Sequence, residues 1–99
     1  MDPATLFLLA VMNLSIHFDH VQTLHAADEP AKYYETNKHI GEHPTRGRVN
    51  RWFIASHVVN TGIVLALPKK WGWGYAVGVT VIETGYVMRN RAIGVQVKF

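Results

Sequence analysis

Apolar and polar residues alternate in long blocks along this chain of 99 residues. The first apolar run, Ala4–Phe18, holds no charged residue, and two later runs are interrupted mainly by small polar side chains. A membrane-spanning helix needs about 20 such residues at ~1.5 Å of rise each. The pattern therefore predicts a single all-α membrane domain, residues 1–99, in which three transmembrane helices enclose a polar interior. Their expected ranges are about 4–27, 49–67 and 71–88.

The stretches outside the helices also carry a pattern. Residues 28–50 contain no Gly/Ser tract and no charge run, so we expect a structured loop over this stretch, with 28–48 on the cytoplasmic side. The tail, 89–99, ends in alternating apolar and smaller residues, which indicates a strand or an extended segment on the membrane surface. Pro3 suits the first helical turn and Asp2 the position before it. The alternative architecture has two spans and an interfacial first helix.

Composition favours a membrane-embedded chain. Apolar residues make up 48% and charged residues 17% of the sequence, against about 25% charged residues in soluble domains. Cysteine is absent, which excludes disulfides and thiolate metal sites. The net charge of +3 comes from basic residues mixed with acids, so nucleic-acid binding is not expected. Attraction to anionic lipid headgroups explains the basic residues more simply.

The basic residues near the helix ends predict the orientation in the membrane, because cytoplasmic loops carry an excess of Lys and Arg. With three spans, the first loop and the tail share one side and hold eight basic residues, whereas the other side holds Lys69 and Lys70. We therefore expect the N-terminus outside and the C-terminus in the cytoplasm. The eight residues are Lys32, Lys38, Arg46, Arg48, Arg51, Arg89, Arg91 and Lys98.

Each predicted helix carries a polar stripe at helical spacing. Unsatisfied polar groups in hydrocarbon cost several kcal/mol, so the stripes should face one another. For Asn13, Thr61, Thr80 and Thr84 we expect packing hydrogen bonds only. The stripes contain Asn13, His17, Asp19, His20, Gln22 and Thr23, then Asn50, His57, Asn60 and Thr61, and finally Thr80, Glu83, Tyr86 and Asn90.

Asp19 and Glu83 differ from the other polar residues of the stripes, because a carboxylate at membrane depth is costly and is usually retained for a function.

Gly74 and Gly78 stand four residues apart on the third helix, a spacing that lets helices approach closely. The pattern leaves open whether they meet a helix of this chain or of a second copy. The expected partners are thus the lipid bilayer and a homo-oligomer formed through Gly74 and Gly78.

Several short sequence motifs along the chain form a combined pattern. They are Asp19-x-x-Gln22-Thr23, Tyr34-Glu35-Thr36-Asn37, Ile40-Gly41-Glu42-His43-Pro44, Gly47-Arg48-Val49 and Glu83-Thr84-Gly85. From about residue 19 to residue 94 the chain resembles a family of small membrane proteins of bacteriophages and prophages of Gram-negative bacteria, pseudomonads among them. The family has no established activity. The resemblance implies a bacterial inner-membrane setting and functional roles for Asp19, Gln22, Thr23, Glu35, Asn37, His43 and Glu83.

These residues suggest a site at the cytoplasmic end of the bundle. Catalytic roles fall to Asp19, Glu35, His43 and Glu83, with Gln22, Thr23, Asn37, His57 and Asn60 as ligand-binding residues. Imidazole and carboxylate groups suit a divalent metal, for which His20 and His43 are the candidate ligands. The expected function is binding of a metal ion or polar ligand, with hydrolysis of a lipid or peptide as the reaction.

Two other functions are compatible with the same sequence. Short length, three spans and a basic C-terminus also fit a holin-like protein that permeabilises the membrane. Such a pore has no need of an Asp-Gln-Thr patch paired with a distant Glu, which favours the site-based function. The third possibility is an accessory subunit of a larger membrane complex. Whether the protein is an enzyme is left open by the sequence.

Overall fold

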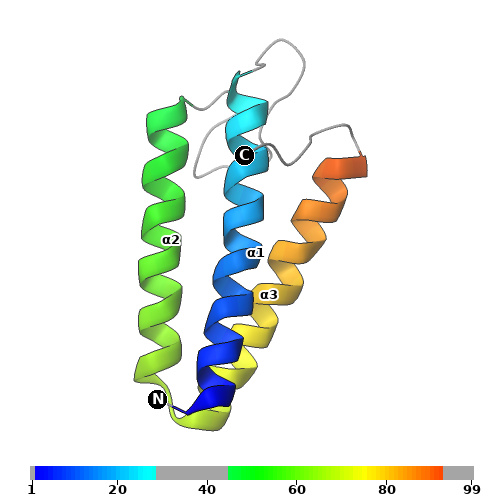
Figure 1. Ribbon diagram of the computed structural model, residues 1–99. Helices are drawn as coiled ribbons and strands as arrows, with labels where there is room; N and C mark the ends of the chain where they lie inside the picture. The colour runs from blue at the N-terminus through cyan, green and yellow to red at the C-terminus, as the bar shows by residue number, and fades with distance from the viewer. Residues whose placement is uncertain (1, 29–44, 93–99) are drawn as a thin grey trace.

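The computed structural model describes residues 2–28 and 45–92, which form three helices and contain no strand (Figure 1). These are α1 (Pro3–Asp28), α2 (Arg46–Ala66) and α3 (Lys69–Ala92). In Figure 1, α1 and α3 run in the same direction and α2 runs in the opposite one. The all-α prediction is confirmed for this part of the chain. The predicted loop site residues Glu35, Asn37 and His43 lie outside the described residues.

The helices extend beyond the predicted ranges, most clearly in α3. This helix starts at Lys69 and ends at Ala92, whereas the apolar pattern predicted 71–88. The assignment of all of 89–99 to a non-helical tail was therefore wrong. Arg89 and Arg91 occupy the last turn of α3, where positive charge interacts favourably with the partial negative charge of the helix end.

The turn between α2 and α3 is short and brings the two helices close together. Leu67 donates its N–H to the carbonyl of Ile63 (3.0 Å), and Gly72 donates to the carbonyl of Pro68 (2.8 Å). A Cβ atom on Gly72 would lie 2.6 Å from the carbonyl oxygen of Val64. Only glycine therefore allows this approach of α3 to α2.

Gly74 and Gly78 do not pack against another described helix of this chain, and their role in a homo-oligomer stays a prediction. A Cβ atom added to either residue would meet no atom within 4 Å. The small residues that pack against neighbours are Gly72 and Ala76, which share the four-residue spacing but lie on another face of α3. Ala76 is fully buried. Gly74 and Gly78 instead lie on the exposed surface of α3.

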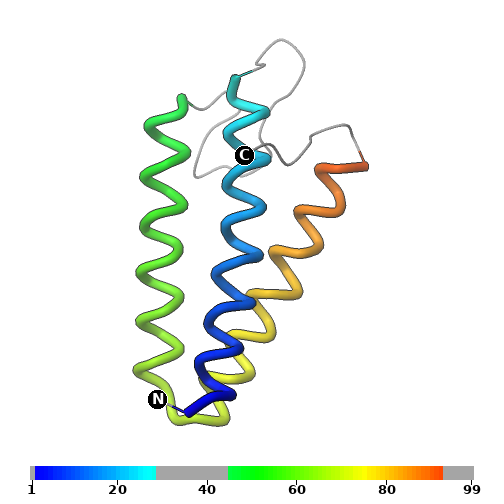
Figure 2. Tube along the Cα trace, viewed as in Figure 1, coloured from blue at the N-terminus to red at the C-terminus, as the bar shows by residue number. Residues whose placement is uncertain are grey.

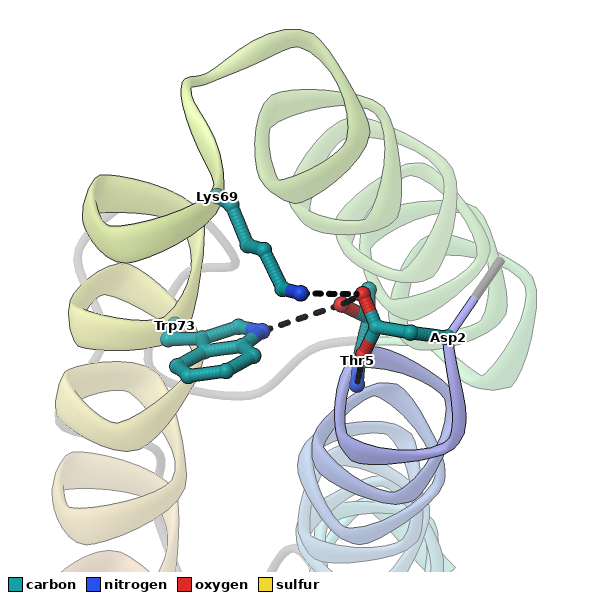
Figure 3. A network of polar contacts seen from close by, with 4 residues as sticks. All are labelled: Asp2, Thr5, Lys69 and Trp73. Carbon is teal, nitrogen blue, oxygen red and sulfur yellow. Dashed lines mark hydrogen bonds and ion pairs between the residues drawn. The ribbon is translucent and has the colours of Figure 1, made fainter.

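A polar cluster joins the start of α1 to the start of α3, and we call Asp2, Thr5, Lys69 and Trp73 the N-terminal cluster (Figure 3). Asp2 accepts hydrogen bonds from the N–H (2.9 Å) and the hydroxyl (3.1 Å) of Thr5, as an N-cap residue does. Lys69 Nζ lies 3.1 Å from the Asp2 carboxylate and 5.1 Å from the centre of the Trp73 ring. The Trp73 indole donates to the Thr5 hydroxyl at 2.9 Å.

The helices diverge away from this cluster, as α3 leans away from α2 towards its C-terminal end (Figure 2). The buried apolar core therefore depends on α1, which contributes residues facing both partners. The core contains Leu9, Met12, Ile16, Val49, Phe53, Val64 and Ala76.

The outer surface of the bundle carries many large apolar side chains. Among the described residues, fifteen large apolar side chains are exposed, against eight apolar side chains that are buried. Several of the exposed ones form the outer faces of α2 and α3, including Ile54 at 60%, Val58 at 68% and Val81 at 65% exposure. Meanwhile Gln22 and Thr23 are buried, at 0% and 2%. So many exposed large aliphatic side chains around a small core are unusual for a water-soluble domain.

One described helix, α1, is long and apolar enough to cross a membrane, with a mean hydropathy of 1.3. Only 28% of its most apolar stretch is buried in the bundle, whereas a core helix of a soluble protein would be mostly buried. The helices α2 and α3 do not meet the same criterion. Residues such as His57 and Asn60 on α2 and Glu83 on α3, which belong to the predicted polar stripes, lower their hydropathy.

Candidate functional site

The middle of the bundle is held by a hydrogen-bond network centred on Asn13 of α1. Its Oδ1 lies 2.7 Å from Nδ1 of His57, and its Nδ2 donates to the hydroxyl of Thr61 at 3.2 Å. Nδ2 also donates to the carbonyl of Leu9 at 2.9 Å. The prediction that Asn13 and Thr61 form packing hydrogen bonds is confirmed. His57, predicted to bind a ligand, is a partner of Asn13 in this network.

Asn60 belongs to a different contact. The predicted stripe of α2 grouped it with His57 and Thr61, but its Oδ1 accepts a hydrogen bond from the Tyr75 hydroxyl of α3. Its Nδ2 donates to the carbonyl (2.8 Å) and the hydroxyl (3.0 Å) of Ser56. These contacts use both polar atoms of the Asn60 amide and connect α2 to α3.

His20 lies nearer the other end of the bundle, between α1 and α2. Its Nε2 is joined to Oδ1 of Asn50 by a hydrogen bond of 2.7 Å. Its ring stacks on Phe53 with a centroid distance of 4.9 Å and an interplanar angle of 7°. One imidazole nitrogen of this candidate metal ligand is thus already engaged, and its predicted co-ligand His43 lies outside the described residues.

The carboxyl groups of Asp19 on α1 and Glu83 on α3 face each other, and we call them the carboxyl pair. They are close enough for a hydrogen bond once one of them carries a proton. Oε2 of Glu83 is wholly buried and has no hydrogen-bond donor among the described residues. The convergence expected of Asp19 and Glu83 is therefore present, whereas the remaining predicted catalytic residues, Glu35 and His43, are not described.

Gln22 and Thr23 follow Asp19 along α1 and make separate contacts. The amide of Gln22 donates to the carbonyl of Val87 (3.0 Å) and accepts from Nδ2 of Asn90 (3.2 Å). The hydroxyl of Thr23 donates to the backbone carbonyl of Asp19 at 2.8 Å and lies 3.4 Å from its carboxylate. Of these two predicted ligand-binding residues, Gln22 therefore connects α1 to α3, and Thr23 contacts Asp19 within α1.

The third helix fits its predicted stripe only in part. Glu83 and Asn90 face α1, as expected, but Tyr86 is 47% exposed. The Thr80 hydroxyl donates to the carbonyl of Ala76 within its own helix (2.7 Å). Tyr75 and the Val87 carbonyl are the polar partners that the sequence did not indicate. Tyr75 lies outside the predicted stripes, and the position of a backbone carbonyl cannot be predicted from residue types.

A metal centre has limited support from these residues. Across 2–28 and 45–92, no group of three or more His, Asp and Glu side chains is placed to hold a metal ion. The carboxyl pair supplies two acidic groups, so any further protein ligand would have to come from elsewhere. What the pair does provide is concentrated negative charge beside a buried, unsatisfied oxygen atom.

Comparison with known proteins finds no matching family model, no matching curated protein and no matching solved structure. The function is therefore argued from the bundle and its polar interior.

Proposed function

We propose that this is a small integral membrane protein whose polar interior binds a cation at Asp19 and Glu83. The first part of the proposal is supported by the apolar outer surface and by α1, the helix that is long and apolar enough to span a bilayer. Lipid tails solvate exposed aliphatic side chains, while hydrogen bonds between helices satisfy polar groups inside. All three helices would then cross the membrane, with α2 and α3 placing their polar side chains inward.

The cation site is carried by one observation, the buried Oε2 of Glu83 without a donor beside the carboxyl group of Asp19. Two carboxyl groups in contact repel each other when both are ionised, and burial makes unneutralised charge more costly. A bound cation or a proton removes this cost. The Thr23 hydroxyl contacts the Asp19 carboxylate, and Gln22 joins α1 to α3 close by, so both helices that carry the pair are connected beside it.

The charge distribution supports the proposed orientation. α2 begins and α3 ends at the same end of the bundle (Figure 1), which brings together Arg46, Arg48, Arg51, Arg89 and Arg91. The opposite end, beside the start of α1, holds Lys69 and Lys70. The basic end would face the cytoplasm, with the N-terminus outside.

The setting in a phage or prophage and in the bacterial inner membrane rests on the resemblance of short sequence strings alone. Hydrolysis of a lipid or peptide depends on Glu35 and His43, and it stays a prediction from the sequence. The cation site needs neither residue, because Asp19 and Glu83 meet without them.

A second candidate function is assembly into a membrane-permeabilising oligomer, as in a holin. It is favoured by the exposed Gly74 and Gly78, which have open space where a neighbouring helix would pack. The cation site remains the preferred function, because a packing surface gives no reason for two carboxyl groups to meet inside the bundle.

The test is binding of Mn²⁺ to the purified protein in uncharged detergent, followed by the electron paramagnetic resonance signal of the free ion. Asp19→Asn and Glu83→Gln should each weaken binding by about tenfold or more, which is ~1.4 kcal/mol. Asp28→Asn is the matched control, since Asp28 is exposed and paired with Arg46 at the surface (2.5 Å). Equal Mn²⁺ affinity in the wild type and all three variants would contradict a cation site at the carboxyl pair.

A further inference from the structure

An apolar groove of about 230 Å³ lies between α1 and α3. Two of the hydroxyl groups along it are already used, because Ser15 donates to the carbonyl of Met12 and Thr80 to that of Ala76, each at 2.7 Å. These side chains therefore present mainly carbon to the groove, which suits a hydrocarbon chain. The lining residues are Val11, Leu14, Ser15, Phe18, Thr80, Thr84 and Val87.

The carboxyl pair does not line this α1–α3 groove itself, but both of its residues lie within one helical turn of residues that do. Asp19 lies one helical turn after Ser15, and side chains four residues apart share a helix face. Glu83 lies three residues after Thr80 and four before Val87, both of which line the groove. An apolar channel and a pair of acidic groups are thus neighbours between the same two helices.

The apolar groove and the nearby carboxyl pair together determine which kind of ligand could bind. An anionic headgroup would be repelled by the two carboxyl groups, and a bare metal ion would leave the groove unused. An ammonium group offers three N–H donors, one of which could satisfy Oε2 of Glu83, the buried oxygen that lacks a partner. We propose that the groove and the carboxyl pair together bind a lipophilic ammonium ion, with its alkyl chain between α1 and α3 and its charged group against Asp19 and Glu83.

The volume of the groove and the depth of the carboxyl pair narrow the class of ligand further. About 230 Å³ is less than the ~300–1,000 Å³ usual for drug-sized ligands, so a single-chain amine fits better than a two-chain lipid. Asp19 and Glu83 each stand nine residues before the end of their helix, or ~13 Å inward at ~1.5 Å per residue. This inference rests on the proposed membrane setting and cation site, and the ligand would enter sideways from the bilayer.

Decylammonium is a suitable probe for the purified full-length protein in uncharged detergent, with binding followed by the rise in the thermal unfolding midpoint. Decanol has a similar chain without the charge, and methylammonium has the charged group without the chain. Decylammonium should stabilise the protein clearly more than either compound at equal concentration. Equal stabilisation by decanol and decylammonium would overturn the role of the carboxyl pair in this ligand.

Filling the groove separates this inference from the proposed function. Thr84 is exposed, so Thr84→Phe should fold and weaken decylammonium binding about tenfold or more, while Thr84→Val should leave it unchanged. Leu14→Phe, at another exposed wall residue, serves as a second groove-filling variant. Thr84→Phe and Leu14→Phe should leave Mn²⁺ binding unchanged. Glu83→Gln should weaken the binding of both Mn²⁺ and decylammonium.

The outcomes distinguish two kinds of failure. If the wild type binds Mn²⁺ at the carboxyl pair but groove-filling variants bind decylammonium as tightly as it does, the groove has no role and the cation site stands. If Glu83→Gln changes the affinity for neither Mn²⁺ nor decylammonium, both the proposed cation site and the proposed ammonium site are wrong.

Discussion

Asn13 is the residue on which the middle of the bundle depends. One side-chain amide satisfies His57 and Thr61 from α2 and the carbonyl of Leu9 from its own helix. In a largely apolar environment, a polar group that loses its hydrogen-bond partner cannot readily form a replacement hydrogen bond with water. The free-energy cost of burying that group is then not offset.

Asn13→Ala should therefore destabilise the bundle by about 1–2 kcal/mol, since it leaves His57 and Thr61 without their α1 partner. Denaturant unfolding in detergent, followed by circular dichroism, measures the change. Leu14→Ala is the matched control, because Leu14 is the next residue of the same helix and is 53% exposed. If the two variants are equally stable, the Asn13 network contributes nothing to the fold.

Asp2 offers a prediction on pH. The N–H of Thr5, and to a smaller extent Lys69, lower the pKa of the Asp2 carboxyl from 3.8 to about 2. Because the folded form has the lower pKa, the stabilisation is present above pH 3.8 and is lost as the pH falls through about 2. Exchange of the Thr5 amide hydrogen should accelerate over this interval. Asp2→Asn keeps an acceptor but cannot titrate, so a similar acceleration in this variant would rule out Asp2 as the cause.

At the residue scale, the sequence indicated which side chains lie inside but not how they pair. Spacing along α1 placed Asn13 in one stripe and Asp19 and Gln22 in an adjoining patch. Asn13 contacts α2, whereas Asp19 and Gln22 contact α3. The identity of the partners depends on the rotation and tilt of α2 and α3, which no single stripe determines. This is why Asn60 was grouped with His57, although its partner is Tyr75.

At the element scale, the contact between α2 and α3 depends on Gly72. Its Cα approaches the carbonyl of Val64 so closely that no side chain fits between them. The sequence contains both Gly72-x-x-x-Ala76 and Gly74-x-x-x-Gly78, and spacing alone cannot choose between them. The direction in which Trp73 and Tyr75 reach their partners, Thr5 and Asn60, decides which face of α3 turns inward.

Gly72→Ala should separate α3 from α2 and cost about 1–3 kcal/mol, the usual range for overpacking. Gly74→Ala is the control, because its Cβ has open space and alanine is the better helix former by ~0.5–1 kcal/mol. Thermal unfolding in detergent should place Gly72→Ala below the wild type and Gly74→Ala at or above it. The reverse order would mean that α3 presents its other face to α2.

The ends of the helices could not be predicted from hydropathy. Hydropathy locates the apolar part of a helix and stops at the first charges, whereas a helix continues as long as its backbone hydrogen bonds do. The helix α3 therefore includes Lys69, Lys70, Arg89 and Arg91, which the apolar pattern had excluded. The number and order of the helices followed from the pattern, since each apolar block is bounded by polar residues.

At the scale of the whole molecule, the described chain is a bundle with polar contacts inside and aliphatic side chains outside. α1 alone among the described helices meets the hydropathy criterion for a span, yet α2 and α3 pack against it in one bundle (Figure 1). A helix can enter a bilayer with polar residues when neighbours satisfy them. Under the proposed membrane setting, the inward-facing polar residues of α2 and α3 would be the physical reason that these two helices fall below the criterion.

Membrane topology tests this inside-out arrangement most directly. The chain has no cysteine, so the single variants Ala4→Cys, Lys70→Cys and Arg91→Cys each carry one thiol for labelling by an impermeant maleimide. On intact spheroplasts, Ala4→Cys and Lys70→Cys should be labelled, and Arg91→Cys should react only after the membrane is opened. Labelling of Lys70→Cys but not Ala4→Cys would indicate two spans and an interfacial α1. Labelling of all three from one side would contradict the membrane-spanning bundle.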